Sequence, residues 1–444
     1  MIIWAMGASE RELPYHSRLV EHHVNTKPQE VNDIESNSTP SAIPASTTKP
    51  QADSANTPGY KPKPQGKLLM EITAMSGEYP ASFLPRLIPA ASYAKKIVSA
   101  LIGDKLIKPV SEGGLKGYRL TPKGKKQLVL DNPARFAGLL DGTVETNKVR
   151  SGHERRLRLH TIAETSTVMH NAGVEIFKDV KPKVYLPDLP PLPSQPSVTI
   201  EGRNPGQHRP HIITVPCFYT SREQKGQDDN AIRGSRAAGT LLTPTCAYAI
   251  YNTGSKESRW SKNVEQRFKA EVEANICRKL PGGQYEGMAL DGVMIGKGME
   301  TLEKYLAADE KGLNAYHFLT RVYSSFYYIT NDIYGEAQLR LLCDSEKMTV
   351  LRNAMLQRNL PPDKSHPVEN DAMTEDGSPV LFCCLLDIPR LIRFKTSVFL
   401  HKKLGRVAAF DFQADMLEHY LGDAATVVSL NFNEIMARLF HENN

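Results

Sequence analysis

Long apolar runs are absent from this sequence of 444 residues. No stretch approaches the roughly 18 consecutive apolar residues that a membrane-spanning helix needs. The opening stretch Met1–Met6 is apolar, but it is too short for the core of a signal peptide and no basic leader precedes it. We therefore expect a cytoplasmic protein without membrane contact.

Motifs of metal and nucleotide chemistry are also scarce. The six cysteines include no CxxC pair, so buried free thiols are expected rather than a zinc site. No GxGxxG motif follows a predicted strand, and GxSxG and HExxH motifs do not occur. The segment Gly292–Gly298 fits a P-loop poorly, because three residues separate Gly292 from Gly296 where four are needed, and glycine follows Lys297. The sequence thus predicts no cofactor, no metal ion and no catalytic residue.

Charge is unevenly distributed along the chain. The formal net charge is only +6, from 55 Lys and Arg against 49 Asp and Glu. Between Lys61 and Lys126, however, thirteen Lys and Arg stand against four Asp and Glu, a local charge of +9 that leaves −3 for all other residues. Such a concentration is typical of polyanion binding, because each Lys or Arg near a phosphate can release a condensed counterion.

Composition and periodicity divide the chain into four segments. Residues 1–66 are rich in Ser, Thr, Pro, Asn and Gln and have too few large apolar residues to offset their ordering entropy, so a disordered tail is predicted. A winged helix-turn-helix is predicted over 67–150, a helix and Pro-rich linker over 151–200, and an α/β domain over 201–444. The predicted fold is therefore an α+β winged helix-turn-helix followed by an α/β domain.

The second segment carries the winged-helix prediction. Apolar residues recur at helical spacing from Leu68 to Met75, a short helix fits 81–87, and a third helix is predicted over 91–107. Two extended arms then flank Glu112-Gly113-Gly114, a turn signal for a hairpin, and another helix begins near Pro122. The segment Tyr118–Gly124 resembles the sequence that closes the wing in many winged-helix transcription regulators.

Candidate DNA-binding residues lie on the third helix and around the wing. The outward face of that helix, in the position of a recognition helix, carries Ser92, Lys95, Lys96 and Ser99. Tyr93 either touches a base edge or phosphate or packs inside. Basic residues suited to the flanking phosphates are Lys116, Arg119, Lys123, Lys125 and Lys126, with an additional contact offered by Arg155, Arg156 and Arg158. The alternatives are a solubilising surface, a solvated helix face or a protein-interaction module.

From residue 211 onward, strand and helix patterns alternate, which favours a mostly parallel sheet covered on both faces. Strands are predicted at 212–218, 239–242, 247–251, 287–295, 324–329, 379–386, 407–412 and 426–430. Asp332, Asp387 and Asp411 lie at strand ends, where open α/β sheets place ligands. Asp387 and Asp411 could meet at one edge of the sheet and hold magnesium. The preferred interpretation is that these strand-end aspartates cap helices or lie in loops.

A metal-dependent nuclease is the enzymatic alternative. Restriction-type nucleases place acidic residues and a Lys on neighbouring strands, so that two carboxylates hold the metal. Here Glu265, Glu271 and Glu273 lie on a predicted helix, and Asp291 with Lys297 lacks the adjacent acid-x-Lys pattern. An inactive relative of such a fold fits the sequence better than an active enzyme.

Parts of the chain resemble the replication-relaxation-type winged-helix proteins carried by plasmids and integrative conjugative elements. The similar segments are Gly234–Leu242, Ala247–Gly254 with Trp260, the helix around Glu265, and Glu154–His160. The resemblance implies an N-terminal winged helix and a degenerate restriction-nuclease-like domain, in which Asn252 stands where the family's strand motif has an acid. It also implies a role in plasmid or element replication or conjugative transfer.

Together these patterns predict a sequence-specific double-stranded DNA-binding protein of a mobile genetic element. A binding protein without catalytic activity is favoured over an enzyme. Its α/β domain would serve for self-association as a homodimer or for recruiting a relaxase or replication protein. Transcriptional repression is a further alternative, because it requires the same DNA contacts at a different site.

Overall fold

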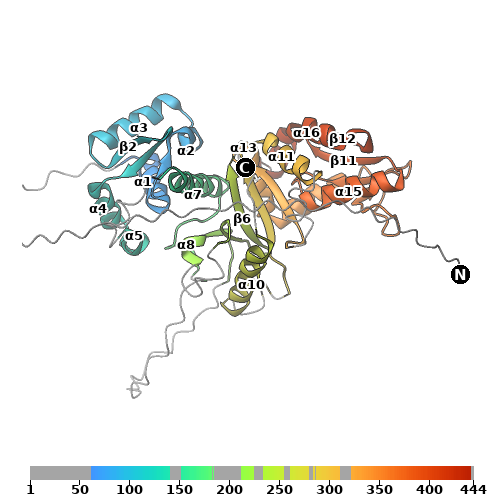
Figure 1. Ribbon diagram of the computed structural model, residues 1–444, viewed down its shortest axis with the longest axis horizontal. Coiled ribbons are helices and arrows are strands. Elements are labelled where there is room, and N and C mark those ends of the chain that lie inside the picture. The colour runs from blue at the N-terminus through green and yellow to red at the C-terminus, as the bar shows by residue number, and fades with distance from the viewer. Residues whose placement is uncertain are drawn as a thin grey trace, which may run out of the picture. The chain divides into compact units, whose positions relative to one another are not determined.

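Helices and strands alternate through the described parts of the chain in a mixed α/β fold (Figure 1). The computed structural model describes residues 62–140, 152–182, 184, 212–224, 234–254, 261–279, 284–285, 287–310 and 322–441. The predicted disordered tail up to residue 61, and most of the predicted Pro-rich linker, lie outside these residues.

The first described part consists of short helices around a small antiparallel sheet. Its elements are α1 (Pro64–Ser76), β1 (Tyr79–Pro80), a 3-10 turn (Ala81–Phe83), α2 (Leu84–Leu87), α3 (Ala91–Gly103), β2 (Ile107–Glu112), β3 (Leu115–Leu120), α4 (Pro122–Asp131) and α5 (Pro133–Leu140). Strand β3 is central and pairs antiparallel with both β1 and β2. Helix α3 buries Ala94, Ile97, Val98 and Leu101, because residues three or four positions apart share one helix face.

Two predicted boundaries shift in this part. Helix α1 begins at Pro64, inside the predicted tail, and proline suits the first turn of a helix, where its missing N–H costs nothing. Helix α3 ends at Gly103 rather than at Ile107, because Lys105 adopts a left-handed conformation (φ 58°) that a right-handed helix cannot continue. Ile107 is instead the first residue of β2.

Helix α7 (His153–Asn171) packs against two groups of elements. It contacts α1, β1 and β3, and it also contacts β6 (Ala247–Gly254) and α13 (Ile333–Leu342). Its buried Ala163, Val168 and Met169 belong to one apolar cluster shared by both groups. Contacts place the described residues between 62 and 441 in one compact unit, and the domain boundaries at 66, 150 and 200 stay predictions.

The remaining strands form two sheets instead of the single mostly parallel sheet that the sequence predicts. The sheet orders are β4-β5-β6-β7-β8 and β12-β11-β10-β9. The strands are β4 (Cys217–Thr220), β5 (Ala237–Leu242), β6, β7 (Asp291–Gly296), β8 (Phe326–Thr330), β9 (Ala372–Met373), β10 (Pro379–Phe382), β11 (Gly405–Phe410) and β12 (Ala425–Leu430). β6, β7 and β8 run parallel, as do β10, β11 and β12, whereas β4–β5, β5–β6 and β9–β10 are antiparallel. A short connection such as 243–246 between β5 and β6 forces the chain to reverse, which explains the antiparallel pairs.

Helices cover both faces of the larger sheet. The helices of this part are α8 (Ser221–Gln224), α10 (Lys262–Lys279), α11 (Met299–Glu310), α13, α14 (Ser345–Leu356), α15 (Ile388–His401), α16 (Asp411–Leu421), a 3-10 turn (Gly422–Ala424) and α17 (Phe432–His441). In β6, Ala249 and Tyr251 join the apolar cluster that contains Phe268 of α10, while Tyr248 and Ile250 join the cluster of α7. This alternation follows from the two-residue period of a strand. In the described ranges, no helix combines the length and apolar composition needed to cross a membrane.

Candidate nucleic-acid interface

The outward face of α3 carries the polar and basic side chains that the periodicity predicts. Ser92, Lys95, Lys96 and Ser99 are all exposed, on the side of the helix away from its buried stripe. The helix begins at Ala91 without a side-chain cap on its first-turn N–H groups. Exposed ammonium groups and the positive end of a helix dipole both favour contact with an anionic polymer.

Tyr93 packs toward α1 instead of projecting freely from α3. Its hydroxyl donates a hydrogen bond to Oε1 of Gln65 at 3.4 Å, and Nζ of Lys63 lies 5.4 Å from the centroid of its ring. The ring is half-buried. Of the two predicted roles, the structure therefore shows packing, and this packing brings the charge of Lys63 beside the start of α3.

The predicted hairpin is formed by β2 and β3, which are paired from Ile107–Leu120 to Glu112–Leu115. Its turn residues Gly113 and Gly114 both have positive φ, 58° and 79°. A two-residue hairpin turn of this kind requires positive φ at both positions, which glycine adopts at little cost. The hairpin exposes Lys116, and Lys108 is exposed on β2.

The three lysines that follow the hairpin lie in the first turns of α4. Thr121 caps this helix, because its Oγ1 accepts a hydrogen bond from the N–H of Gly124 at 3.1 Å. Lys123 and Lys126 are exposed, although Nζ of Lys123 also donates to a backbone carbonyl at 3.0 Å. Lys125 is half-buried and has an interaction partner within the protein. Lys123 and Lys126 are therefore better placed than Lys125 for an external phosphate.

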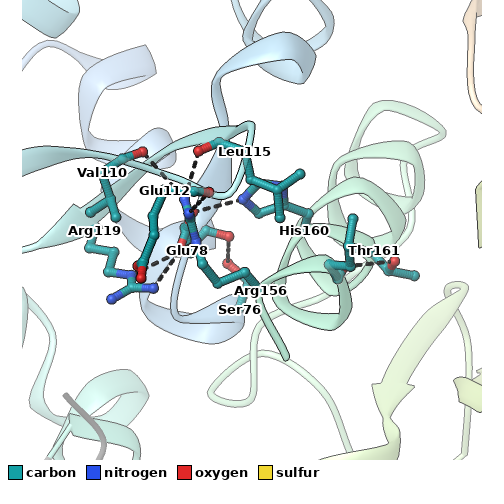
Figure 2. Close-up of polar contacts among 10 residues, drawn as sticks. Ser76, Glu78, Val110, Glu112, Leu115, Arg119, Arg156, His160 and Thr161 are labelled. Atoms are coloured by element: carbon teal, nitrogen blue, oxygen red, sulfur yellow. Dashed lines mark hydrogen bonds and ion pairs between the residues drawn. The ribbon is translucent and has the colours of Figure 1, made fainter. Parts of the chain in front are cut away.

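The structure corrects the interpretation of Arg156, which the sequence groups with Arg155 and Arg158 as an additional DNA contact. Arg155 and Arg158 are exposed on α7, but the side chain of Arg156 is 0% exposed. Arg156 shares a helix face with His160, and both side chains point to the equally buried carboxylate of Glu78 (Figure 2). A buried guanidinium that is already paired has no surface to offer to DNA.

Glu78 accepts hydrogen bonds from three basic residues. Arg156 donates from Nε to both carboxylate oxygens at 3.1 Å and from Nη2 to Oε1 at 2.5 Å. Arg119 donates from Nε to Oε2 at 2.8 Å, and Nε2 of His160 lies 2.8 Å from Oε1. Burial by itself would raise the pKa of Glu78, but the hydrogen bonds from His160, Arg156 and Arg119 outweigh burial and lower the pKa to about 2. The carboxylate is therefore ionised at neutral pH.

Arg156 also holds the hairpin directly. Its Nη1 donates to the backbone carbonyl of Glu112 at 2.6 Å, and its Nη2 donates to the carbonyls of Val110 at 3.3 Å and Leu115 at 3.1 Å (Figure 2). These carbonyls lie on both strands of the hairpin, next to its turn. One buried side chain thus fixes the end of the hairpin, including the backbone beside Lys116, to α7.

We call Glu78, Arg119, Arg156 and His160 the wing clamp. The clamp engages Arg119, a predicted DNA contact, whose side chain is only 18% exposed and pairs with Glu78 through Nη2 at 2.7 Å. The hairpin's freely exposed basic charge therefore comes from lysines, while its arginine has a structural partner. A rigid hairpin loses less conformational entropy when its lysines bind a ligand.

Sequence reasoning missed Glu78 altogether. A signal was present on α7, where Arg156 and His160 are four residues apart and lie on the same face as the apolar Ala163. A buried face with two basic residues requires an acidic partner. The candidates were few, because Glu78 is one of only four acidic residues between Lys61 and Lys126.

Gly117 is required for the close approach of β3 to the clamp. A Cβ at this position would lie 2.5 Å from Oε1 of Glu78 and 2.8 Å from the carbonyl oxygen of Tyr79. We expect Gly117→Ala to lower the free energy of unfolding by about 1–3 kcal/mol, as overpacking does. Gly103→Ala is the matched control, because no heavy atom lies within 4 Å of its Cβ position. Equal urea midpoints for the two variants would contradict this account of Gly117.

Two of the strand-end aspartates accept hydrogen bonds from backbone N–H groups at the starts of helices. Oδ1 of Asp332 accepts from the N–H groups of Tyr334 at 3.0 Å and Gly335 at 3.1 Å, and Asp332 is the N-cap of α13, as the capping interpretation predicts. Asp411 is exposed as the first residue of α16 and accepts from the N–H of Phe412 at 2.9 Å, but the N-cap of this helix is Phe410.

Asp387 and Asp291 are each bound to the backbone at the start of β8. Asp387 accepts a hydrogen bond from the N–H of Phe326 at 3.3 Å, and Asp291 accepts from the N–H of Ser325 at 3.0 Å. Burial raises the pKa of both carboxyl groups, and the charge of Asp387 raises that of Asp291 further. Asp387 therefore interacts with Asp291, which the sequence did not pair with it.

The residues of the nuclease alternative have structural partners as well. Glu265 is buried and accepts hydrogen bonds from Oγ of Ser235 at 2.8 Å, the N–H of Arg236 at 3.1 Å and the hydroxyl of Tyr251 at 2.7 Å. Asn252 donates to Oγ1 of Thr165 on α7 at 3.0 Å. Lys297 is exposed in the turn between β7 and α11. Among the described residues, no group of three or more His, Cys, Asp or Glu side chains could hold a metal ion.

Free thiols, which the sequence predicts, are present at Cys217, Cys246, Cys343, Cys383 and Cys384. Cys217, Cys383 and Cys384 are buried. Burial raises the pKa of Cys384 to about 12, so this thiol is protonated and unreactive at neutral pH.

Comparison of the chain with protein-family models, with curated proteins and with solved structures finds no match. A function must therefore be inferred from the charge and geometry of the residues themselves.

Proposed function

We propose that residues 64–131 are a winged helix-turn-helix and that the protein binds double-stranded DNA at a specific site through them. The observation that carries the proposal is the exposed face of α3 with Ser92, Lys95, Lys96 and Ser99, beside a clamped hairpin that exposes Lys116. The order of three helices, a hairpin and a further helix supports it. So does the local charge of +9 between Lys61 and Lys126.

In this proposal α3 enters the major groove, where serine and lysine side chains reach base edges. Lys116 on the hairpin and Lys123 and Lys126 on α4 bind the flanking phosphates, which fix register and orientation. Arg158, exposed on α7, extends the phosphate contacts. The phosphate contacts supply affinity that depends on salt, and the α3 contacts supply sequence preference.

We further propose that the protein acts in replication or conjugative transfer of a mobile genetic element, as its resemblance to replication-relaxation-type proteins implies. The α/β part then serves for homodimer assembly or for recruiting a relaxase or replication protein. The degenerate restriction-nuclease-like fold that this resemblance implies receives support from the mixed strands β4 to β7, which lie between α7 and α11 in the chain. Binding is favoured over cleavage because the carboxylates of this part already bind backbone amides or hydroxyl groups.

The proposal is tested by selecting duplexes from a random-sequence DNA pool with the full-length protein and measuring affinity for the enriched site. Lys95→Glu with Lys96→Glu should weaken binding by roughly 1–3 kcal/mol or more, which is about fivefold to more than hundredfold. The preference for the enriched site over unrelated duplexes should also fall, because the lost contacts are those that read base edges.

The matched control carries Lys402→Glu and Lys403→Glu, an adjacent exposed lysine pair outside residues 64–131. It produces the same change in net charge as the α3 variant. Unchanged binding by the α3 variant, or an equal loss in both variants, would remove the recognition helix from the proposal.

A further inference from the structure

Six consecutive exposed residues, Phe399–Leu404, form the end of α15 and the turn that follows it. Three of them are large and apolar: Phe399 is 76% exposed, Leu400 is 68% exposed and Leu404 is 56% exposed. Single exposed leucines are common on protein surfaces, but apolar side chains gathered in one place mark interaction sites.

The core does not account for these side chains. Helix α15 turns Leu391, Ile392, Phe394 and Val398 inward, and these residues share one face. Leu400 follows Val398 by two positions, about 200° around the helix, and therefore faces solvent. Phe399 follows Ile392 by seven positions and shares its side of the helix, yet Phe399 is exposed near the helix end. Polar residues are expected at exposed positions, so these aromatic and aliphatic groups require another explanation.

Four of these six residues, Phe399, Leu400, Lys402 and Lys403, line a hollow of about 430 Å³ between the end of α15 and the turn before β12. The other lining residues are Val398, Asp423 and Ala424. We call this cavity the α15 hollow. Its lining combines apolar side chains of α15 with two lysines and a single carboxylate.

We propose that the α15 hollow binds an acidic segment of a partner protein, which inserts an apolar side chain between Phe399 and Ala424. The carboxylates of that segment pair with Lys402 and Lys403. Apolar contact in the hollow supplies affinity, and the lysine charges of its lining speed association and select against basic partners.

The two lysines of the lining favour this occupant over a second copy of the chain. A symmetric dimer would use the same patch on both copies and would bring the two lysine pairs toward each other. Asp423 in the lining would repel anionic headgroups, which disfavours a lipid surface as the occupant.

The experiment selects phage-displayed random peptides on the full-length protein, with counter-selection on a Phe399→Ser, Leu400→Ser variant. Enriched peptides should carry Asp or Glu beside a Phe, Trp or Leu, and should bind this variant at least about tenfold more weakly. The Lys402→Glu, Lys403→Glu variant should lose these peptides and bind versions in which Lys replaces the acids. Such a charge swap cannot result from unfolding, and the substituted side chains are exposed.

Several outcomes overturn the proposal. Peptides without acidic residues, peptides that bind all variants equally, or no enrichment at all would each do so. A concentration-dependent dimer that Phe399→Ser, Leu400→Ser dissociates would assign the hollow to a second copy, and binding to phosphatidylglycerol vesicles lost in that variant would assign it to a membrane. The Lys95→Glu, Lys96→Glu variant serves as control and should retain peptide binding, so failure here is distinguishable from failure of DNA binding.

Discussion

Replacement of Glu78 by Gln is expected to lower the free energy of unfolding by about 3–5 kcal/mol, the typical cost of removing one partner from a buried ion pair. The substitution leaves the buried guanidinium of Arg156 without its counter-ion, and Gln supplies only one acceptor oxygen for the donors of Arg156, Arg119 and His160. Urea denaturation followed by circular dichroism measures the effect. Glu112→Gln is the control, because the Glu112 side chain is exposed on the same hairpin and only its carbonyl binds Arg156.

The contribution of Glu78 should also depend on pH in a defined window. Its pKa is lowered from 4.5 to about 2 by folding, so the unfolded chain binds the proton more tightly. The stabilisation is therefore complete above about pH 5 and is lost as the pH falls toward 2, a change of about 3 kcal/mol. Between pH 7 and pH 2 the stability difference between wild type and Glu78→Gln should shrink by that amount. A difference that stays constant with pH would show that the ionised carboxylate does not contribute.

Local patterns in the sequence predict the surface of this protein better than its buried polar contacts. The inward stripe Ala94–Leu101 and the outward Lys95 and Lys96 of α3 follow from helical period alone. The hairpin follows from Gly113 and Gly114, because the turn is decided by the residues that form it. Both features depend only on residues that are close together in the sequence, and both are present in the structure.

The wing clamp could not be predicted in the same way, since Arg156 and Glu78 are 78 positions apart. The run Glu154–His160 contains three arginines that look alike in sequence, and only packing against the hairpin decides that Arg156 is buried while Arg158 is exposed. Sheet assignment fails for a related reason. Each strand can be located from its own residues. Contacts between distant segments, however, decide whether β8 pairs with β10 in a single sheet or forms the edge of its own sheet.

Arg156→Met should lower the free energy of unfolding far more than Arg158→Met, although the two residues are only two positions apart on α7. Loss of Arg156 leaves Glu78 with fewer donors and frees three hairpin carbonyls, so we expect destabilisation of about 3–5 kcal/mol. Loss of the exposed Arg158 should change the free energy of unfolding by less than about 0.5 kcal/mol. If Arg158 binds a phosphate, its loss should reduce the salt dependence of DNA binding by about one unit of slope.

A double-mutant cycle then tests whether Glu78 and Arg156 stabilise the fold as one coupled pair or as two independent residues. If Glu78 and Arg156 act as one buried pair, Glu78→Gln with Arg156→Met should cost less than the sum of the single substitutions, by about 0.5–3 kcal/mol. The double variant removes both charges, so neither remains buried without a partner. Additive costs would mean that Arg156 stabilises the fold through the hairpin carbonyls alone. In that case Gly117→Ala, which displaces Glu78 from β3, should leave the effect of Arg156→Met unchanged.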